Sequence, residues 1–289
     1  MRLFYYVHTG HRIGLDRFRR AATIIRALGD ADITLLTSDF RIASAARSYG
    51  IKRAVGVDVV RNIPQIAHNG DKIIFDSAEI NPVMLDDMTR YFSTFIRVSD
   101  DPNAQKHPGE LLVSPYLEGE GVFKGVAVDD ACFASKEKTI ERAFFFGDDD
   151  YEEDLAAHQE TFAGLDLELL QGFYWFLGYE KKLKNSFGAL HDEEEYEEVV
   201  ARSDIFVTAS PQAALENLAG GGKPIYLQRR DYPTDFIPLF ESLNIPVMTE
   251  YNRERLSFLI NNITSNNYQT CPKNTDMLAS FLKQNLDLY

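Results

Sequence analysis

The segment IFVTASPQAALENLAGGGKP, residues 205–224, predicts a buried strand that leads directly into a helix. Residues 205–207 are apolar and favour a strand, Ser210 can cap a helix with Pro211 at its first position, and glycines 220–222 mark its end. The N-terminus of such a helix offers unpaired backbone N–H groups and the positive end of the helix dipole, which suit a phosphate group. The same pattern also fits an ordinary strand–helix unit without a ligand, so only the wider sequence distinguishes the two.

Apolar runs of strand length alternate with segments of helical period along the chain. In the first half, we expect strands at 3–7, 33–36, 54–57, 72–75 and 95–98, and helical segments at 15–28, 42–49, 63–67 and 84–95. In the second half, we expect strands at 143–146, 167–177, 205–207 and 225–228, and helices at 151–162, 179–187, 193–201, 211–218, 235–243, 252–262 and 274–287. This order predicts an α/β fold with parallel sheets and helices on both faces.

The alternation weakens between residues 107 and 138, where Pro, Gly and charged residues are frequent. A chain of 289 residues also favours two domains, at about 150 residues per domain. We therefore expect two doubly wound, Rossmann-like domains, 1–140 and 141–289, facing each other across a cleft. Ligands of such folds lie at the carboxyl ends of the strands. The aromatic run GFYWFLGY, residues 172–179, falls in an expected central strand, where packing inside is favoured over a partner surface.

The charge of the chain argues against several classes of partner. With 44 acidic and 30 basic residues, its formal net charge is −14, which disfavours nucleic acid and acidic membrane surfaces.

Cys132 and Cys271 match no metal-binding spacing, and the acidic run 192–198 fits a solvated helix face better than a metal patch. Because no apolar run approaches the roughly 18 residues of a membrane span, and no dinucleotide fingerprint follows the first strand, we expect a cytoplasmic protein without a membrane span, metal or cofactor.

Five motifs occur in the order found in a known family: IGLDRFRR at 13–20, KIIFD at 72–76, RVSDDP at 97–102, FFFGD at 144–148, and the segment 203–224. Gly14 and Arg20 match a glycine-rich loop and its arginine after the first strand. In this order, the chain resembles the nucleotide-sugar enzymes of the two-domain glycosyltransferase-B (GT-B) fold. Among these enzymes it is most similar to the UDP-sugar hydrolase of pseudaminic acid biosynthesis.

The resemblance implies a nucleotide-binding second domain and a first domain for the sugar or acceptor, on which the last helix can pack back. The backbone around Ser210, Pro211 and Gln212 would then bind the diphosphate, and Glu216 or Asn217 the ribose. Gly14 and Gly147 would line the site. Arg229 would either clamp phosphate or cap a strand end.

The catalytic residues that the resemblance implies depart from the family pattern. The family's histidine falls at Arg17, and a guanidinium that stays protonated cannot act as a general base. Arg17 and Arg20 would instead stabilise leaving-group charge. Asp76, Asp100 or Asp101 is the candidate base, because burial can raise a carboxyl pKa. His11 is a substitute for the missing histidine, against the alternative of an ordinary surface histidine.

Two functions follow from the resemblance. In the first, the protein is a metal-independent enzyme of surface-glycan or nonulosonic-acid synthesis, a glycosyltransferase or UDP-sugar hydrolase, with a UDP-linked sugar as its partner. In the second, it is a catalytically inactive relative that binds or regulates in a glycan pathway. The departure at Arg17 motivates the second.

Overall fold

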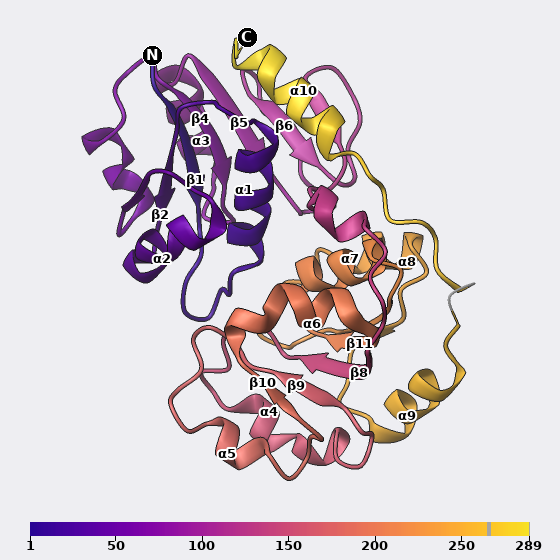
Figure 1. Ribbon diagram of the computed structural model, residues 1–289. Coiled ribbons are helices and arrows are strands. Elements are labelled where there is room, and N and C mark those ends of the chain that lie inside the picture. The colour runs from indigo at the N-terminus through magenta and orange to yellow at the C-terminus, as the bar shows by residue number, and fades with distance from the viewer. Residues whose placement is uncertain (265–266, 289) are drawn as a thin grey trace. The chain divides into compact units, whose positions relative to one another are not determined.

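The computed structural model describes residues 1–264 and 267–288, which form two compact units. Unit 1 contains residues 1–10, 17–127 and the chain from 274 onward. Unit 2 contains residues 11–16 and 128–273. Each unit is an α/β fold built on one parallel sheet. In Figure 1, residues 128–273 of unit 2 run from magenta to orange, and its residues 11–16 are indigo.

Unit 1 has a seven-stranded parallel sheet in the order β3-β2-β1-β4-β5-β6-β7. Its strands are β1 (Leu3–Val7), β2 (Ile33–Thr37), β3 (Ala54–Gly56), β4 (Lys72–Asp76), β5 (Thr94–Val98), β6 (Leu111–Ser114) and β7 (Val122–Lys124). Its helices are α1 (Asp16–Ala27), α2 (Phe40–Ala45), α3 (Pro82–Tyr91) and α10 (Thr275–Asn285), with 3-10 turns η1 (Ala46–Tyr49) and η2 (Val60–Gln65). Strands β1 and β4 are buried along their whole length, as expected for central strands covered on both faces.

Unit 2 has a six-stranded parallel sheet in the order β10-β9-β8-β11-β12-β13. Its strands are β8 (Ile140–Phe145), β9 (Glu168–Leu170), β10 (Leu190–His191), β11 (Ser203–Thr208), β12 (Lys223–Leu227) and β13 (Val247–Met248). Its helices are α4 (Asp154–Ala157), α5 (Glu180–Leu183), α6 (Tyr196–Arg202), α7 (Pro211–Ala219), α8 (Ile237–Ser242) and α9 (Arg253–Asn262). Its 3-10 turns are η3 (Asp130–Phe133), η4 (Gln159–Thr161) and η5 (Glu193–Glu195).

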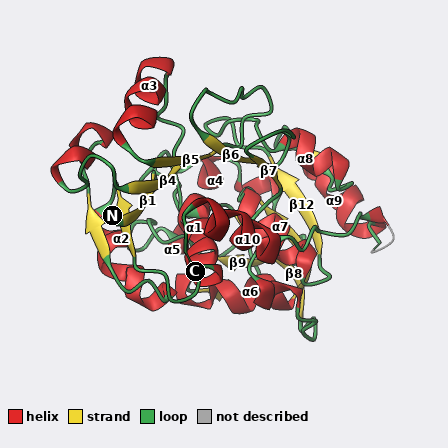
Figure 2. Cartoon of the chain, turned by 90° about the horizontal axis from the view of Figure 1, so that it is seen from above, coloured by secondary structure: helices red, strands yellow, loops and turns green. Residues whose placement is uncertain are grey.

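Both sheets reverse their strand order beside the first strand of the unit. The reversal lies between β1 and β4 in unit 1 and between β8 and β11 in unit 2. On one face of the second sheet, Phe144 packs with residues of α5 and α9, and on the other Phe206 packs with residues of α6 and α7. Figure 2 shows these helices in red and the strands in yellow. This arrangement confirms the predicted doubly wound α/β fold, whose ligand sites lie at the carboxyl ends of the strands beside the reversal.

Two sequence predictions about strands were wrong. The weak region between 107 and 138 contains β6 and β7, which are only four and three residues long and lie among turns rich in Pro and Gly. The expected strand at 167–177 ends at Leu170, and residues after it form turns in which Phe176 is 52% exposed. The backbone at Gly172 packs so closely that no side chain fits there: a Cβ would lie 2.4 Å from the carbonyl oxygen of Gly147.

The division between the units falls after Ala127, whereas the sequence placed it near residue 140. Strands β6 and β7 extend the first sheet up to Lys124, and the chain that follows packs with unit 2. Helix α10 belongs to unit 1, where Phe281 contacts Phe123 of β7 with ring centroids 5.8 Å apart. In the described part of the chain, no helix has both the length and the hydropathy needed to cross a membrane.

Candidate functional site

Helix α7 begins at the carboxyl end of β11, directly beside the strand reversal of unit 2. The Ser210 hydroxyl accepts a hydrogen bond from the Ala213 N–H at 3.1 Å, which makes Ser210 the N-cap, and Pro211 takes the first helical position. The Thr208 hydroxyl in turn accepts the Ser210 N–H at 3.0 Å. The strand, cap and helix predicted from the sequence are therefore confirmed, and the helix N-terminus lies where such a fold binds anions.

The turn after β8 lies on the other side of the same reversal. Gly147 has a φ of +113°, a conformation that favours glycine, and three aspartates follow it. Asp150 accepts the backbone N–H groups of Asp154 at 2.8 Å and Leu155 at 3.1 Å, so its carboxylate satisfies the first N–H groups of α4. The Tyr179 hydroxyl also donates to Asp150.

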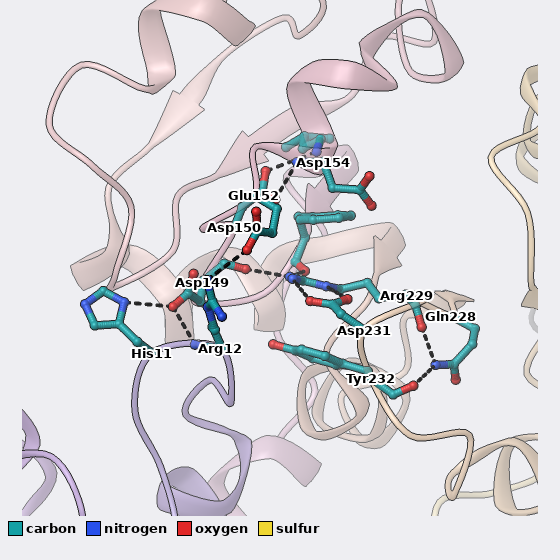
Figure 3. Close-up of polar contacts among 12 residues, drawn as sticks. His11, Arg12, Asp149, Asp150, Glu152, Asp154, Gln228, Arg229, Asp231 and Tyr232 are labelled. Carbon is teal, nitrogen blue, oxygen red and sulfur yellow. Dashed lines mark hydrogen bonds and ion pairs between the residues drawn. The ribbon is translucent and has the colours of Figure 1, made fainter.

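Asp148 and Asp149 bind the loop at residues 11–16, which belongs to unit 2 and ends at Asp16, the first residue of α1. Asp149 accepts hydrogen bonds from the backbone N–H of Arg12 at 2.7 Å and lies 2.9 Å from Nδ1 of His11 (Figure 3). Asp148 accepts the Leu15 N–H at 3.0 Å. His11 is thus part of the anchor that holds this loop.

Two further contacts complete the loop. Gly14 has a φ of +77°, and a Cβ there would lie 3.1 Å from the Tyr232 hydroxyl oxygen, so the loop requires glycine at this position. The Ser210 hydroxyl donates to a carboxylate oxygen of Asp16 at 2.5 Å. A carboxylate of the chain itself therefore lies at the N-terminus of α7.

Arg229 binds the turn after β8 through its guanidinium. Its guanidinium lies between the rings of Phe146 and Tyr232, 4.3 and 4.4 Å from their centroids. Nη1 donates to the carbonyl oxygens of Asp149 at 2.5 Å and Phe146 at 3.2 Å, and Nε and Nη2 bind Asp231 at 2.9 and 2.6 Å (Figure 3). Its guanidinium donates to groups of the protein itself, so Arg229 positions the turn after β8.

The two candidate ribose residues on α7 have different surroundings. Glu216 accepts hydrogen bonds from the Tyr196 hydroxyl at 2.9 Å and from Nε2 of Gln212 at 2.8 Å. The Asn217 amide nitrogen donates instead to the carbonyl oxygens of Val200 at 2.8 Å and Ser203 at 3.0 Å. Asn217 therefore ties α7 to the turn between α6 and β11, while Glu216 lies one helical turn after Gln212.

Unit 1 has its own cluster of charged side chains at the carboxyl edge of its sheet. Asp76, the last residue of β4, is fully buried and accepts Nε and Nη2 of Arg20 at 2.9 and 2.6 Å. Asp100, which follows β5, accepts Nη1 and Nη2 of the same guanidinium at 2.5 and 3.1 Å. The Tyr5 hydroxyl donates to Asp76 at 3.1 Å. Nε of Arg17 lies 3.7 Å from a carboxylate oxygen of Asp76.

Arg20 and Asp100 shift the pKa of each other. Burial would raise the pKa of Asp100, but the charge and hydrogen bonds of Arg20, together with the charge of Arg17, hold that pKa below its usual value. The pKa of Arg20 is raised, because the two carboxylates outweigh the opposing effect of burial. The rise in pKa expected for a buried base is therefore wrong for Asp100, which is an ionised partner of Arg20.

Comparison with solved structures agrees with this architecture. The chain is similar to a UDP-GlcNAc 2-epimerase of Methanocaldococcus jannaschii in complex with UDP-GlcNAc and UDP, with a TM-score of 0.63 and 11% identity over 98% of this chain and 100% of that one. It is also similar to Anabaena HepE in complex with UDP, with a TM-score of 0.60 and 11% identity over 100% and 98% of the two chains. The calicheamicin glycosyltransferase CalG4 gives a TM-score of 0.56 and 11% identity over 99% and 94%.

The chain has a GT-B-type fold. No protein-family model and no curated protein sequence matches it. At these identities, the likeness establishes the fold, and the function has to be argued from the side chains.

Within this GT-B-type fold, the residues selected from the sequence form two groups. Arg17, Arg20, Asp76 and Asp100 cluster in unit 1, and His11, Gly14, Gly147, Ser210, Pro211, Gln212, Glu216 and Arg229 lie around the strand reversal or α7 in unit 2. The sequence did not indicate that Asp148 and Asp149 would anchor a loop, although their position directly after an apolar strand was a usable signal. In the described residues, no group of three His, Cys, Asp or Glu side chains could hold a metal ion.

Proposed function

We propose that the protein is a nucleotide-sugar-processing enzyme of glycan synthesis that binds a UDP-linked sugar in unit 2. The observation that supports this most directly is the N-terminus of α7, capped by Ser210 and placed beside the strand reversal. Backbone N–H groups and the helix dipole stabilise an anion at such a position. Proteins of the same fold that contain UDP, such as Anabaena HepE, support UDP as the nucleotide.

In this proposal, the first turn of α7 binds the diphosphate through the Ser210, Pro211 and Gln212 segment. Glu216 binds the ribose in this proposal, because it lies on α7 one helical turn after Gln212 and a carboxylate oxygen can accept a hydrogen bond from a ribose hydroxyl. Asn217 has no such role, since its amide is bound to two backbone carbonyls. Gly14 and Gly147 allow the backbone to approach closely at this end of the sheet.

We assign the stabilisation of leaving-group charge to Arg17, the cation to which the family resemblance gives this role. Its side chain is 20% exposed, whereas that of Arg20 is 10% exposed and bonded to both Asp76 and Asp100. A permanent cation suits that role and requires no metal ion. Arg20 then acts as a positioning residue that holds the two carboxylates in place and lowers the pKa of Asp100.

The first test is thermal unfolding of the protein with UDP, GDP, CDP, TDP, CMP and NAD. A ligand that binds only the folded protein raises the unfolding midpoint, so UDP should raise it and the other nucleotides should have a smaller effect. UDP-sugars should then release UDP in the presence of a chelator, and Arg17→Ala should lower that rate. An unfolding midpoint that no nucleoside diphosphate changes would contradict the proposal.

A second candidate function is a binding or regulatory protein that has lost the chemistry. It is favoured by the state of the two candidate bases, since Asp76 and Asp100 are both ion-paired with Arg20. The resemblance also implies a histidine at the position of Arg17. A UDP-induced rise in the unfolding midpoint without turnover of any UDP-sugar would favour this function. Turnover that disappears in Arg17→Ala would exclude it.

A further inference from the structure

We propose that the loop at residues 11–16 is an internal competitor for the anion site of α7, with the Asp16 carboxylate in the place of a ligand phosphate. This inference rests on the proposed function, because it concerns the same helix N-terminus. It adds that the nucleotide has to displace a group of the chain itself before it binds.

The contact of Asp16 is the one that a phosphate oxygen would make. Its carboxylate accepts the Ser210 hydroxyl at 2.5 Å, and the same hydroxyl accepts the Ala213 N–H at 3.1 Å. The charge therefore lies at the capped end of a nine-residue helix, where the helix dipole favours an anion. A carboxylate and a phosphate oxygen accept the same hydrogen bonds, so they compete for these donors.

A buried tyrosine hydroxyl on the side of the sheet that α7 covers lacks a hydrogen-bond partner among the residues that the structure describes. Tyr226 pairs with Thr208 in the register of β12 and β11, so its side chain lies on the face of Phe206, the face that α7 covers. It is fully buried, and its hydroxyl has no hydrogen-bond partner within residues 1–264 and 267–288. Thr208, its partner in the register, accepts the Ser210 N–H at 3.0 Å, so Tyr226 lies beside a residue that binds the N-cap of α7. Burial and then the charge of Asp16 raise the pKa of Tyr226. A buried donor without a partner is costly, and a ligand oxygen would satisfy it.

Two carboxylates of the turn after β8 hold the loop in this position. Asp148 and Asp149 accept the N–H groups of Leu15 and Arg12 and keep Asp16 against Ser210. A diphosphate placed at the same helix end would meet the Asp16 carboxylate at short range, and like charges in contact are strongly unfavourable. Nucleotide binding therefore requires a loop position in which Asp16 has left Ser210.

This competition lowers the apparent affinity in a calculable way. If only a fraction of the molecules have Asp16 displaced, the apparent dissociation constant is the intrinsic constant divided by that fraction. Removing the charge should raise this fraction. Asp16→Asn is the suitable variant, because it keeps the size of the side chain and an acceptor for the Ser210 hydroxyl while removing the negative charge.

The matched control is Asp166→Asn. Asp166 is an exposed residue of unit 2, and its substitution changes the net charge by the same amount. Its φ of +53° is also tolerated by asparagine, so the variant should fold normally. Any difference between the two variants then reports the position of Asp16, not the total charge.

The experiment measures UDP affinity by titration calorimetry for the wild type and both variants. It also measures hydrogen exchange of the Arg12 and Leu15 amides with and without saturating UDP. We expect Asp16→Asn to bind UDP about tenfold more tightly, because a larger fraction of its molecules has residue 16 displaced from Ser210, and Asp166→Asn to bind as the wild type does. UDP should speed exchange of both amides in the wild type, because displacement of Asp16 loosens the loop.

The outcomes separate this inference from the proposed function. Binding of UDP that is equal or weaker in Asp16→Asn, or slower exchange of the two amides with UDP, overturns the competition and leaves nucleotide binding intact. If neither the wild type nor Asp16→Asn binds UDP or another nucleoside diphosphate, both the competition and the proposed function are overturned.

Discussion

Arg20 determines the electrostatics of the carboxyl edge of the first sheet. One guanidinium binds the carboxylates of Asp76 and Asp100, which come from the ends of two neighbouring strands. The sequence identified all three residues as candidates, but it assigned the carboxylates a base role. The pairing could not be predicted, because Arg20 and Asp100 are 80 residues apart and only the strand order brings them together.

Substitution of Arg20 should be strongly destabilising. Arg20→Leu leaves two buried carboxylates without their cation and should lower the free energy of unfolding by about 3–5 kcal/mol. Arg20→Lys keeps the charge but loses the planar fork, so its loss should be intermediate. Urea unfolding at neutral pH measures both. An Arg20→Leu protein as stable as the wild type would contradict the central role of this ion pair.

The lowered pKa of Asp100 predicts a pH dependence. Its carboxyl is more acidic in the folded protein than in the unfolded chain, so the stabilisation is complete above the unfolded pKa of about 3.9 and is lost as the pH falls through the folded value. Asp100→Asn should therefore be less stable than the wild type at neutral pH, and this difference should shrink in acid. Urea unfolding at several pH values tests this. A difference that is constant or grows as the pH falls would show that Asp100 contributes no such linkage.

Helix α7 is the element on which the proposed function depends, and its start was the most predictable part of the chain. The Ser-Pro pair, the preceding apolar run and the glycines after the helix are local signals, and the structure has β11 and α7 within two residues of the expected bounds. The run at 172–179 was mispredicted because its aromatic content resembles a strand, while Gly172 packs against the Gly147 backbone. That contact is between distant residues and has no local signal.

Two helix caps provide a matched pair of variants. Ser210 caps α7 by accepting the Ala213 N–H at 3.1 Å, and Asn81 caps α3 by accepting the Met84 N–H at 3.0 Å. Ser210→Ala and Asn81→Ala should each lower the free energy of unfolding by about 1 kcal/mol. Only Ser210→Ala should also change the UDP affinity, because α3 lies in unit 1. Equal UDP affinities in the two variants would show that the start of α7 does not contact the nucleotide.

At the scale of the whole molecule, the chain returns to its first unit at its C-terminal end. Lys72 of β4 donates to the Leu286 carbonyl oxygen at 2.6 Å and to Asp287 at 2.8 Å, so a cation lies at the C-terminus of α10. The sequence predicted a helix at 274–287 and the possibility that it packs on the first domain, but it could not identify Lys72 as the contact. A lysine at the start of a strand is usually a solvated residue.

Loss of this contact should loosen α10. Lys72→Met keeps most of the side-chain stem and removes a charged donor, so it should lower the free energy of unfolding by about 1.5–3 kcal/mol. Hydrogen exchange of the α10 amides should become faster. Lys52→Met is the control, because the Lys52 side chain is 79% exposed and lies 3.7 Å from an exposed aspartate. Equal effects of the two substitutions would contradict a specific role for Lys72.

The central claim is that UDP binds with its diphosphate at the N-terminus of α7, and amide NMR tests it most directly. The Gln212 and Ala213 amides should shift saturably as UDP is added, while the Met84 amide at the start of α3 should not. That result would place the phosphates at the predicted helix end. Saturating shifts confined to other residues, or no shift with millimolar UDP, would contradict the claim.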